Sequence, residues 1–303
     1  VWYNTTSNKL KGYSTLSGAW SSGGAMNTNR RSAAGAGTQT AALATSGLHQ
    51  PPGALTKNVE AYDGTSWTEV ANITGVARYD VFNAGTQTAA LIAGGYDHLV
   101  VGLSFTEVYN GTSWTEVSNL GTGRYNGAMG VGIETAALAV GGKVPSGIQN
   151  LNEEYNGTSW SEDTDCNTAR YNQMGSGTVT AALVICGQTP ATVGNTESWN
   201  GTAWTEVNNV NTARHTAGSA LGASNTTSLI FGGYPPISAI TESYDGTSWT
   251  EVGDLALARR AMAGAGIGSA ALAGGGQDGP PPATVTATEE WNSGDSIVTF
   301  TSS

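Results

Sequence analysis

The sequence predicts an all-β fold, a β-propeller of six blades with four antiparallel strands each, and two observations lead to it. Six tryptophans recur at intervals of 47, 47, 46, 44 and 45 residues, and each repeat unit contains four short segments of β type. Periods of about 20 to 50 residues are typical of solenoids, propellers and arrays, and four strands per unit favour a propeller blade. The recurring tryptophans are Trp20, Trp67, Trp114, Trp160, Trp204 and Trp249.

In each unit, an arginine and the segment of small residues after it predict the first two strands. We expect the first strand after the arginine, and the second through Ala-Ala-Leu to a glycine pair such as Gly94-Gly95 or Gly274-Gly275. Small side chains suit the crowded inner part of a ring. No unit offers an apolar face with helical spacing, and this density of Gly and Thr disfavours a helix. The arginines are Arg30, Arg78, Arg124, Arg170, Arg214 and Arg259.

The third and fourth strands flank a repeated turn, as in Tyr62-Asp-Gly-Thr-Ser-Trp67. Asp-Gly and Asn-Gly predict a hairpin, and we expect a type I′ turn, which needs positive φ at both central residues. The Tyr and Trp that flank the turn are expected to pack between sheets at the wider rim.

The order of a glycine pair, a tyrosine, a tryptophan and the next arginine resembles the kelch repeat over nearly all of residues 20–300. We therefore divide the chain into an N-terminal β-hairpin-like segment, residues 1–19, and a six-bladed propeller, residues 20–303. Strands from both termini are expected to close the ring. The segment around Trp20 and the tail at residues 296–300 both remain candidates for the last outer strand, and we favour the former. Kelch-like propellers include ligand platforms, actin binders, adaptors and copper oxidases, so the resemblance indicates little about function.

A second resemblance concerns short sequence motifs along the chain. Residues 1–13 resemble a short module of bacteriophage tail-fibre and other structural proteins. The phrases Gly-Thr-Gln-Thr-Ala-Ala-Leu and Asn-Thr-Ala-Arg are similar to kelch-like propellers of marine phages. This resemblance implies an extracellular, virion-associated protein.

Composition limits the classes of partner. Charged residues make up 12%, the net charge is -11, and only 12 residues are Lys or Arg. We expect no nucleic-acid partner, because no basic stripe is available to neutralise phosphates. We expect no membrane insertion, because no run approaches the roughly 18 apolar residues of a span. The chain does not begin with Met, which fits a fragment or a processed product.

Two cysteines are too few for a disulfide framework or a zinc site. Cys166 and Cys186 lie in the same repeat. They predict either one bridge or two buried thiols, and we favour the thiols.

The connections between strands predict one variable face. In a propeller, the connections between blades and those from second to third strands emerge on the same side. The second-to-third loops differ from copy to copy, which indicates either recognition or unrestrained drift. These loops are residues 48–56, 96–105, 143–149, 188–193, 234–238 and 277–282.

The candidate ligand-binding residues lie on this face. The residue that follows each repeat arginine is a tyrosine, a histidine or a second arginine. In the first unit it is Arg31. These pairs of cationic and aromatic residues are expected to form a ring around the channel mouth. Arginine forks suit carboxylates, and tyrosine faces suit sugar rings. Alternatively each arginine bonds backbone carbonyls between adjacent blades, and its repetition in all six units favours that structural role. The candidates are Arg78, Tyr79, Arg124, Tyr125, Arg170, Tyr171, Arg214, His215, Arg259, Arg260, His49, Tyr96, His98 and Tyr234.

The sequence contains no pattern typical of catalysis, and we expect no catalytic residue, metal or cofactor. The Asp-Gly turns lack the residue between Asp and Gly of a sialidase Asp-box. The three histidines do not make the ligand set of a copper oxidase. Recurring glutamates after the tryptophans predict a solvated rim, namely Glu69, Glu116, Glu206 and Glu251.

These observations predict a non-enzymatic tail-fibre-like or capsid-fibre-like propeller that binds a host cell-surface glycan or protein through its variable loops. Two alternatives remain. One is a structural decoration protein that packs on other virion structural proteins. The other is a secreted glycan-active enzyme.

Overall fold

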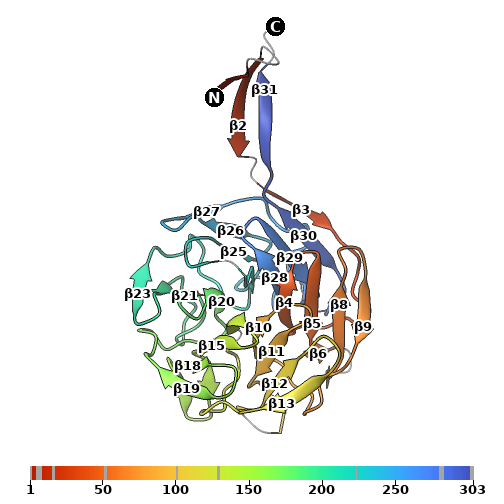
Figure 1. Cartoon of the computed structure of the whole chain (residues 1–303), viewed down its shortest axis with the longest axis vertical. Coiled ribbons are helices and arrows are strands. Elements are labelled where there is room, and N and C mark those ends of the chain that lie inside the picture. Colours follow the sequence, from red (N-terminus) through yellow and green to blue (C-terminus); the bar gives the residue numbers. More distant parts are fainter. Residues whose placement is uncertain are drawn as a thin grey trace.

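The structure is a computed structural model that describes residues 2–4, 9–15, 18–50, 53–99, 102–127, 130–222, 224–279 and 283–300. Six four-stranded antiparallel sheets are arranged in a ring (Figure 1). The chain is therefore an all-β, six-bladed propeller, as its sequence predicts, and its architecture is consistent with a kelch-like propeller. None of the described residues belongs to a helix long and apolar enough to cross a membrane.

Each of the first five blades is a meander in chain order, from the inner strand at the channel to the outer strand at the rim. Blade one contains β4 (Ala34–Thr38), β5 (Ala41–Thr45), β8 (Val59–Tyr62) and β9 (Trp67–Val70). Blade two contains β10 (Phe82–Gly85), β11 (Ala90–Ala93), β12 (Thr106–Tyr109) and β13 (Trp114–Val117). Blade three contains β14 (Gly130–Ile133), β15 (Ala136–Val140), β18 (Asn152–Tyr155) and β19 (Trp160–Asp163). Blade four contains β20 (Met174–Thr178), β21 (Ala181–Ile185), β22 (Thr196–Trp199) and β23 (Trp204–Val207). Blade five contains β24 (Gly218–Ser219), β25 (Ser228–Phe231), β26 (Thr241–Tyr244) and β27 (Trp249–Glu251).

The sixth blade takes strands from both ends of the ring. It contains β28 (Ala263–Ile267), β29 (Ala270–Gly274), β30 (Thr288–Asn292) and, as its outer strand, β3 (Ala19–Ser22). β3 pairs antiparallel with β30, and Trp20 lies opposite Trp291. The first and last parts of the propeller are thereby joined in one sheet.

A three-stranded sheet lies outside the ring. It contains β1 (Trp2–Asn4), β2 (Lys9–Thr15) and β31 (Asp295–Phe300), with β2 in the middle. β2 and β31 pair from Leu10 opposite Phe300 to Thr15 opposite Asp295. Figure 1 shows these two strands leaving the ring side by side, next to β3.

Small residues are required where the inner strands approach one another. A Cβ atom added at Gly35, on β4, would lie 2.1 Å from the carbonyl oxygen of Gly264 on β28. Backbone atoms cannot yield as a flexible side chain can. The Ala-Gly-Ala-Gly sequence of β4 and β28 therefore reflects close packing around the channel.

The hydrophobic core is divided into six clusters, each between two neighbouring blades. The outer-strand tryptophans contribute to this packing. The Trp67 ring lies 5.0 Å from the Tyr62 ring, and Trp67 Nε1 donates a hydrogen bond to Thr288 Oγ1 of the sixth blade at 2.9 Å. Thus the tyrosine and tryptophan of one repeat pack between sheets, as expected.

The turn between the third and fourth strands differs from its expected form. The two central residues of the turn in blade one are Gly64 and Thr65. Gly64 has positive φ (90°), and Thr65 does not. Asp63 lies before the two central residues, and its Oδ1 accepts hydrogen bonds from the backbone N–H groups of Thr65 and Ser66 at 2.9 and 2.8 Å. The predicted hairpin is confirmed, but the type I′ assignment is wrong, because an Asx side chain organises the turn.

Candidate functional site

Six arginines, one per blade, lie inside the propeller rather than on its face. Their side chains are at most 1% exposed, and each forms an ion pair with a glutamate of the third strand. The pairs are Arg30–Glu60, Arg78–Glu107, Arg124–Glu153, Arg170–Glu197, Arg214–Glu242 and Arg259–Glu289.

Arg124 shows what these side chains do. Its Nη1 donates to the carbonyls of Gly141 and Leu151 at 2.9 and 2.8 Å, and its Nη2 donates to Glu153 Oε1 at 2.8 Å. Its own carbonyl accepts a hydrogen bond from Gly95 N of the preceding blade at 2.8 Å. The side chain therefore joins strands within one blade, and the main chain links two blades.

This burial corrects the ligand-binding prediction for Arg78, Arg124, Arg170, Arg214 and Arg259. Their guanidinium groups have internal partners and no access to a ligand. The structural alternative describes them better, although Arg124, Arg170 and Arg259 bond carbonyls of their own blade rather than carbonyls between blades.

The glutamates of these ion pairs are not among the residues that the sequence analysis singles out. Each stands two residues before an aromatic residue at or near the end of the third strand, as Glu153 stands before Tyr155. Glu153 also accepts hydrogen bonds from the backbone N–H groups of Gly121 and Thr122, at 2.6 and 3.3 Å. The regular spacing could have revealed them. By contrast, Glu69, Glu116, Glu206 and Glu251 are exposed, as predicted.

The variable connections do meet on one face. The residue after each arginine forms a backbone bridge with the residue that opens a second-to-third loop, for example Tyr79 with Tyr96 and His215 with Tyr234. Two of these loops also contain short hairpins. These are β6 (Leu48–His49) with β7 (Ala54–Leu55), and β16 (Lys143–Val144) with β17 (Gly147–Ile148). We call this side of the ring the loop face.

The glycine pairs hold the loops to the next blade. The second member donates its N–H to the carbonyl of the next arginine, as Gly142 does to Arg170 at 2.8 Å. In the sixth blade the equivalent pair is Gly275-Gly276, one residue later than expected, because Gly276 N donates to Arg30 O. In blades one and four, Ser46 and Cys186 occupy the first position with positive φ.

One aromatic cluster on the loop face gathers four of the predicted residues. The Tyr79 ring lies 5.4 Å from both Tyr96 and His98, and Tyr96 lies 5.5 Å from Tyr125 of the next blade. His98 is exposed, and the tyrosines are partly exposed. Burial, reinforced by the charge of Asp80, raises the pKa of Tyr79 to about 12, so its hydroxyl is protonated at neutral pH. We call these four residues the aromatic cluster.

A second group lies elsewhere on the same rim. The His215 ring is edge-on to Tyr234 at 5.4 Å, and the Arg260 guanidinium lies 4.7 Å above the Tyr234 ring. Burial, with the charge of Arg260, lowers the pKa of His215 to about 4, so its imidazole is neutral at pH 7. Gln277 Oε1 accepts hydrogen bonds from Arg260 Nε and Nη2 at 3.2 and 3.0 Å. Most predicted residues of the fifth and sixth blades thus meet here.

Apart from the five buried arginines, two predicted residues belong to neither group. Tyr171 lies under Lys143 Nζ, 4.6 Å from its ring centre, and Lys143 was not among the candidates. His49 donates from Nδ1 to the carbonyl of Asn29 at 2.9 Å.

Inside the mouth, a chain of backbone hydrogen bonds follows the ring. The residue two positions after each arginine has positive φ. Ser32 N donates to Ala261 O at 2.7 Å, and Asp80 N donates to Ser32 O at 3.3 Å. Asn172, Thr216 and Ala261 continue the pattern around the channel.

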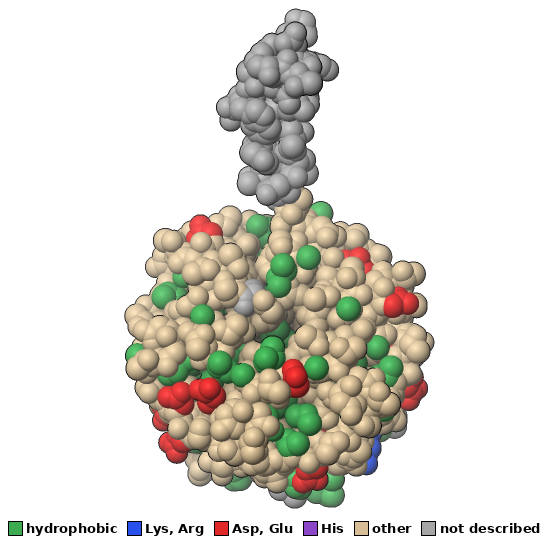
Figure 2. All heavy atoms as spheres, in the orientation of Figure 1, with side chains coloured by type: hydrophobic (Ala, Val, Ile, Leu, Met, Phe, Trp, Pro, Cys, Tyr) green, Lys and Arg blue, Asp and Glu red, His purple; other side chains and the backbone are tan. Residues whose placement is uncertain are grey.

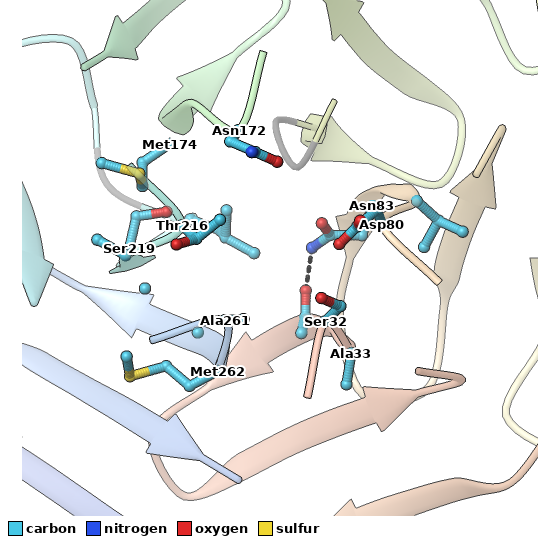
Figure 3. Close-up of a pocket in the computed structure, with 16 residues that line it drawn as sticks. Ser32, Ala33, Asp80, Asn83, Asn172, Met174, Thr216, Ser219, Ala261 and Met262 are labelled. Carbon is cyan, nitrogen blue, oxygen red and sulfur yellow. Dashed lines mark hydrogen bonds between the residues drawn. The ribbon is translucent and has the colours of Figure 1, made fainter. Parts of the chain in front are cut away.

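These residues line a small cavity of about 50 Å³ in the channel, together with apolar side chains such as Met174 and Met262 (Figure 3). In that view Asp80 and Asn83 lie on one side, and Asn172, Thr216 and Ser219 on the other. Asn83 Nδ2 donates to the carbonyl of Gly35. Burial raises the pKa of Asp80 to about 6, although a bond from Ser32 and the charge of Arg31 oppose the shift. The cavity has space for a few water molecules.

A second, larger hollow of about 590 Å³ lies between blades five and six. Its lining includes Gly18, Tyr244, Glu251, Ile267 and Trp291. None of the predicted ligand-binding residues contributes to it.

Neither cysteine is bonded: Cys166 and Cys186 are both buried free thiols. Burial raises the pKa of each to about 12. The described part of the chain contains no group of three or more His, Cys, Asp or Glu residues placed to hold a metal ion.

Comparison with known proteins adds no family assignment. No protein-family model matches the chain. No curated protein matches it significantly either.

Proposed function

We propose that this chain is a non-enzymatic binding propeller that recognises a cell-surface glycan or protein through its loop face. The observation that carries the proposal is the aromatic cluster. Tyr79, Tyr96, His98 and Tyr125 come from two blades and touch edge-on or tilted on the face where the repeats differ. Partly exposed rings that are fixed by their neighbours suit contact with sugar rings or protein side chains.

The contrast between the two faces supports this assignment. The turns between third and fourth strands are near copies of one another and are organised by their own Asx side chains. The loop face combines a fixed backbone, bridged at each blade, with different side chains in each copy. A rigid scaffold with variable loops is the usual arrangement of binding proteins.

The non-enzymatic part of the proposal rests on the chemistry of the channel. Asp80 is the single acidic residue among those that line the cavity. A glycoside hydrolase ordinarily needs two carboxyl groups on opposite sides of the bond that it cleaves. One carboxylate of raised pKa does not supply that pair.

The setting that we propose is a virion, on a tail fibre or a capsid fibre, with a bacterial surface as the target. The phage-like sequence motifs and the low proportion of charged residues, 12%, support this setting. A second candidate, a structural decoration protein that packs on other virion subunits, is favoured by the sheet of β1, β2 and β31. That sheet lies outside the ring and completes none of its blades.

The test compares one substitution pair on the loop face with one on the opposite face. Tyr96→Ser with Tyr125→Ser removes two rings of the aromatic cluster. Ile133→Ser with Ile267→Ser changes two exposed apolar residues at turns between first and second strands. Binding is measured to immobilised bacterial lipopolysaccharides and capsular polysaccharides and to whole bacterial cells.

We expect the wild type and the isoleucine variant to bind the same targets, and the tyrosine variant to lose at least 10-fold in affinity. Equal binding by both variants would remove the loop face from recognition. No binding of the wild type to any target would overturn the proposed function and favour the decoration protein.

A further inference from the structure

We propose that Arg31 and Arg260 form a subsite for the anionic group of a saccharide, either a carboxylate or a sulfate ester. This inference rests on the proposed function and names the chemistry of the ligand. The charged part of recognition then lies at blades one and six, beside the aromatic cluster, because the charge of Arg31 also acts on Tyr79.

The distribution of positive charge points to this place. Six of the 12 Lys and Arg residues are buried in ion pairs. Among the side chains that the structure describes, the other four are Arg31, Lys57, Lys143 and Arg260. Three of these four belong to the ring of bridged positions on the loop face. A chain of net charge -11 thus places most of its remaining described cations around one mouth. In the view of Figure 2, by contrast, acidic side chains are scattered over the molecule, and Lys or Arg is visible only at the edge.

Arg31 and Arg260 are neighbours around that mouth. They occupy equivalent positions on adjacent blades, and the residues that follow them are joined by the 2.7 Å hydrogen bond from Ser32 N to Ala261 O. The charge of Arg31 lowers the pKa of Arg260, in addition to the larger effect of burial. The two guanidinium groups are therefore close enough to repel each other.

Within the described residues, neither arginine has a carboxylate within 4.0 Å, whereas the six arginines of the interior all do. Arg31 Nε is buried and has no hydrogen-bond partner there. The charge of Arg31 acts on Asp80 and opposes the rise in the pKa of that carboxyl, but the two side chains form no ion pair within 4.0 Å. Two adjacent, partly buried cations that are not paired with a carboxylate cost free energy that an anion would recover.

The surroundings favour a saccharide as the carrier of that anion. Tyr234 is 38% exposed and lies under Arg260, with His215 edge-on to it. Gln277 Oε1 accepts hydrogen bonds from Nε and Nη2 of Arg260, which leaves Nη1 of Arg260 for a ligand. A fixed arginine fork beside an exposed aromatic ring matches a sugar that bears a carboxylate or a sulfate. Because His215 is neutral above its lowered pKa, the charge of the subsite comes from the arginines.

The experiment measures the binding of the purified chain, residues 1–303, to five immobilised probes. Oligogalacturonate carries carboxylates, a sulfated galactan carries sulfate esters, and dextran is uncharged. Poly-glutamate carries carboxylates on a peptide, and dextran sulfate reports charge density alone. The variants are Arg31→Gln, Arg260→Gln and Arg260→Lys. Lys57→Gln is the matched control, because Lys57 is an exposed cation outside the ring of bridged positions.

We expect the wild type to prefer oligogalacturonate or the sulfated galactan over dextran by at least 10-fold. Each Arg→Gln change should lower that affinity at least 10-fold, and Lys57→Gln should change it less than twofold. Arg260→Lys keeps the charge but loses the fork, so a clear loss supports bidentate binding. A preference for oligogalacturonate identifies a carboxylate as the ligand group, and a preference for the galactan identifies a sulfate. Equal melting temperatures show that the variants remain folded.

The inference is overturned if the Arg→Gln variants bind as the wild type does, if dextran binds equally well, or if no anionic saccharide binds. Tighter binding to poly-glutamate would assign the subsite to an acidic peptide instead, and preference for dextran sulfate alone would reduce it to general charge attraction. These failures are distinct from failure of the proposed function. That function survives if Tyr96→Ser with Tyr125→Ser still abolishes binding to bacterial surfaces, and it falls if these substitutions have no effect.

Discussion

Arg78 and Glu107 form an ion pair deep inside blade two, with Arg78 Nη1 3.0 Å from Glu107 Oε1 and both side chains at most 1% exposed. Glu107 Oε2 also accepts hydrogen bonds from the backbone N–H and the hydroxyl of Thr74, both at 2.7 Å. The pair therefore joins the third strand of a blade to the connection that enters that blade. Since it recurs in every blade, it is the main polar element of this propeller.

Removal of one partner of such a pair should destabilise the protein strongly. Glu153→Gln leaves the buried Arg124 without its counter-charge, and the loss should be about 3–5 kcal/mol in the free energy of unfolding. Chemical denaturation measures it. Glu116→Gln, at an exposed glutamate, is the control and should stay within about 0.5 kcal/mol of the wild type. Similar values for the two variants would show that the pair is not needed for stability.

The close approach of the inner strands predicts a steric effect. Gly35→Ala places a methyl group 2.1 Å from Gly264 O, so the strands must separate and the protein should lose at least about 2 kcal/mol. Gly279→Ala is a matched control, because a Cβ atom there meets nothing within 4 Å. Thermal unfolding of the two variants checks the difference. A Gly35→Ala protein as stable as the control would contradict the observed packing around the channel.

The tryptophan hydrogen bonds between blades predict a smaller effect. Trp67→Phe keeps most of the packing on Tyr62 but removes the bond from Nε1 to Thr288 Oγ1, which joins blade one to blade six. We expect a loss of about 1–2 kcal/mol, because Thr288 then keeps a buried hydroxyl without this donor. Denaturant titration, with Trp67→Phe compared in wild-type and Thr288→Val backgrounds, isolates the bond. Additive effects in that cycle would show that the bond contributes nothing.

Asp80 predicts a pH dependence of stability. Its pKa of about 6 in the folded chain lies above the value of about 3.9 expected in an unfolded chain. The folded state therefore binds the extra proton between these values. The resulting stabilisation is present below about pH 4 and is lost as the pH rises through about 6.

Asp80→Asn removes this dependence, since the amide stays neutral. The variant should match the wild type at pH 4 and exceed it at pH 8 by about 1–3 kcal/mol, with the lower part of that range favoured by residual contact with water in the channel. Unfolding curves from pH 4 to pH 8 check this. A constant difference between the two proteins across that range would mean that Asp80 titrates normally.

Much of the fold can be predicted from the sequence because each repeat carries its own local signals. The spacing of the tryptophans gives the number of blades, and the Asp-Gly turns mark the hairpins. The type of turn could not be predicted, because it depends on whether Asp63 lies inside the two-residue loop or just before it. That register is set by pairing of Tyr62 with Trp67 across the strands.

The site could be predicted less well, because burial is a property of the assembled ring. Arg78 and Tyr79 are adjacent in sequence, yet the first points into the blade and the second lies on the loop face. The glutamate partner of Arg78 comes 29 residues later, so no local pattern joins the two. Lys143 and Asp80 could not be predicted as parts of the site for the same reason, because the residues that they contact, such as Tyr171 and Ser32, belong to other blades.

Recognition through the loop face is tested most directly by an amide hydrogen-exchange footprint of the wild-type chain with and without the bacterial polysaccharide that it binds most tightly. We expect slower exchange in residues 96–99 and 234–238 of the loop face, and unchanged exchange in turns such as residues 63–66 and 245–248. Protection of those turns, with no change at the loops, would contradict recognition through the loop face.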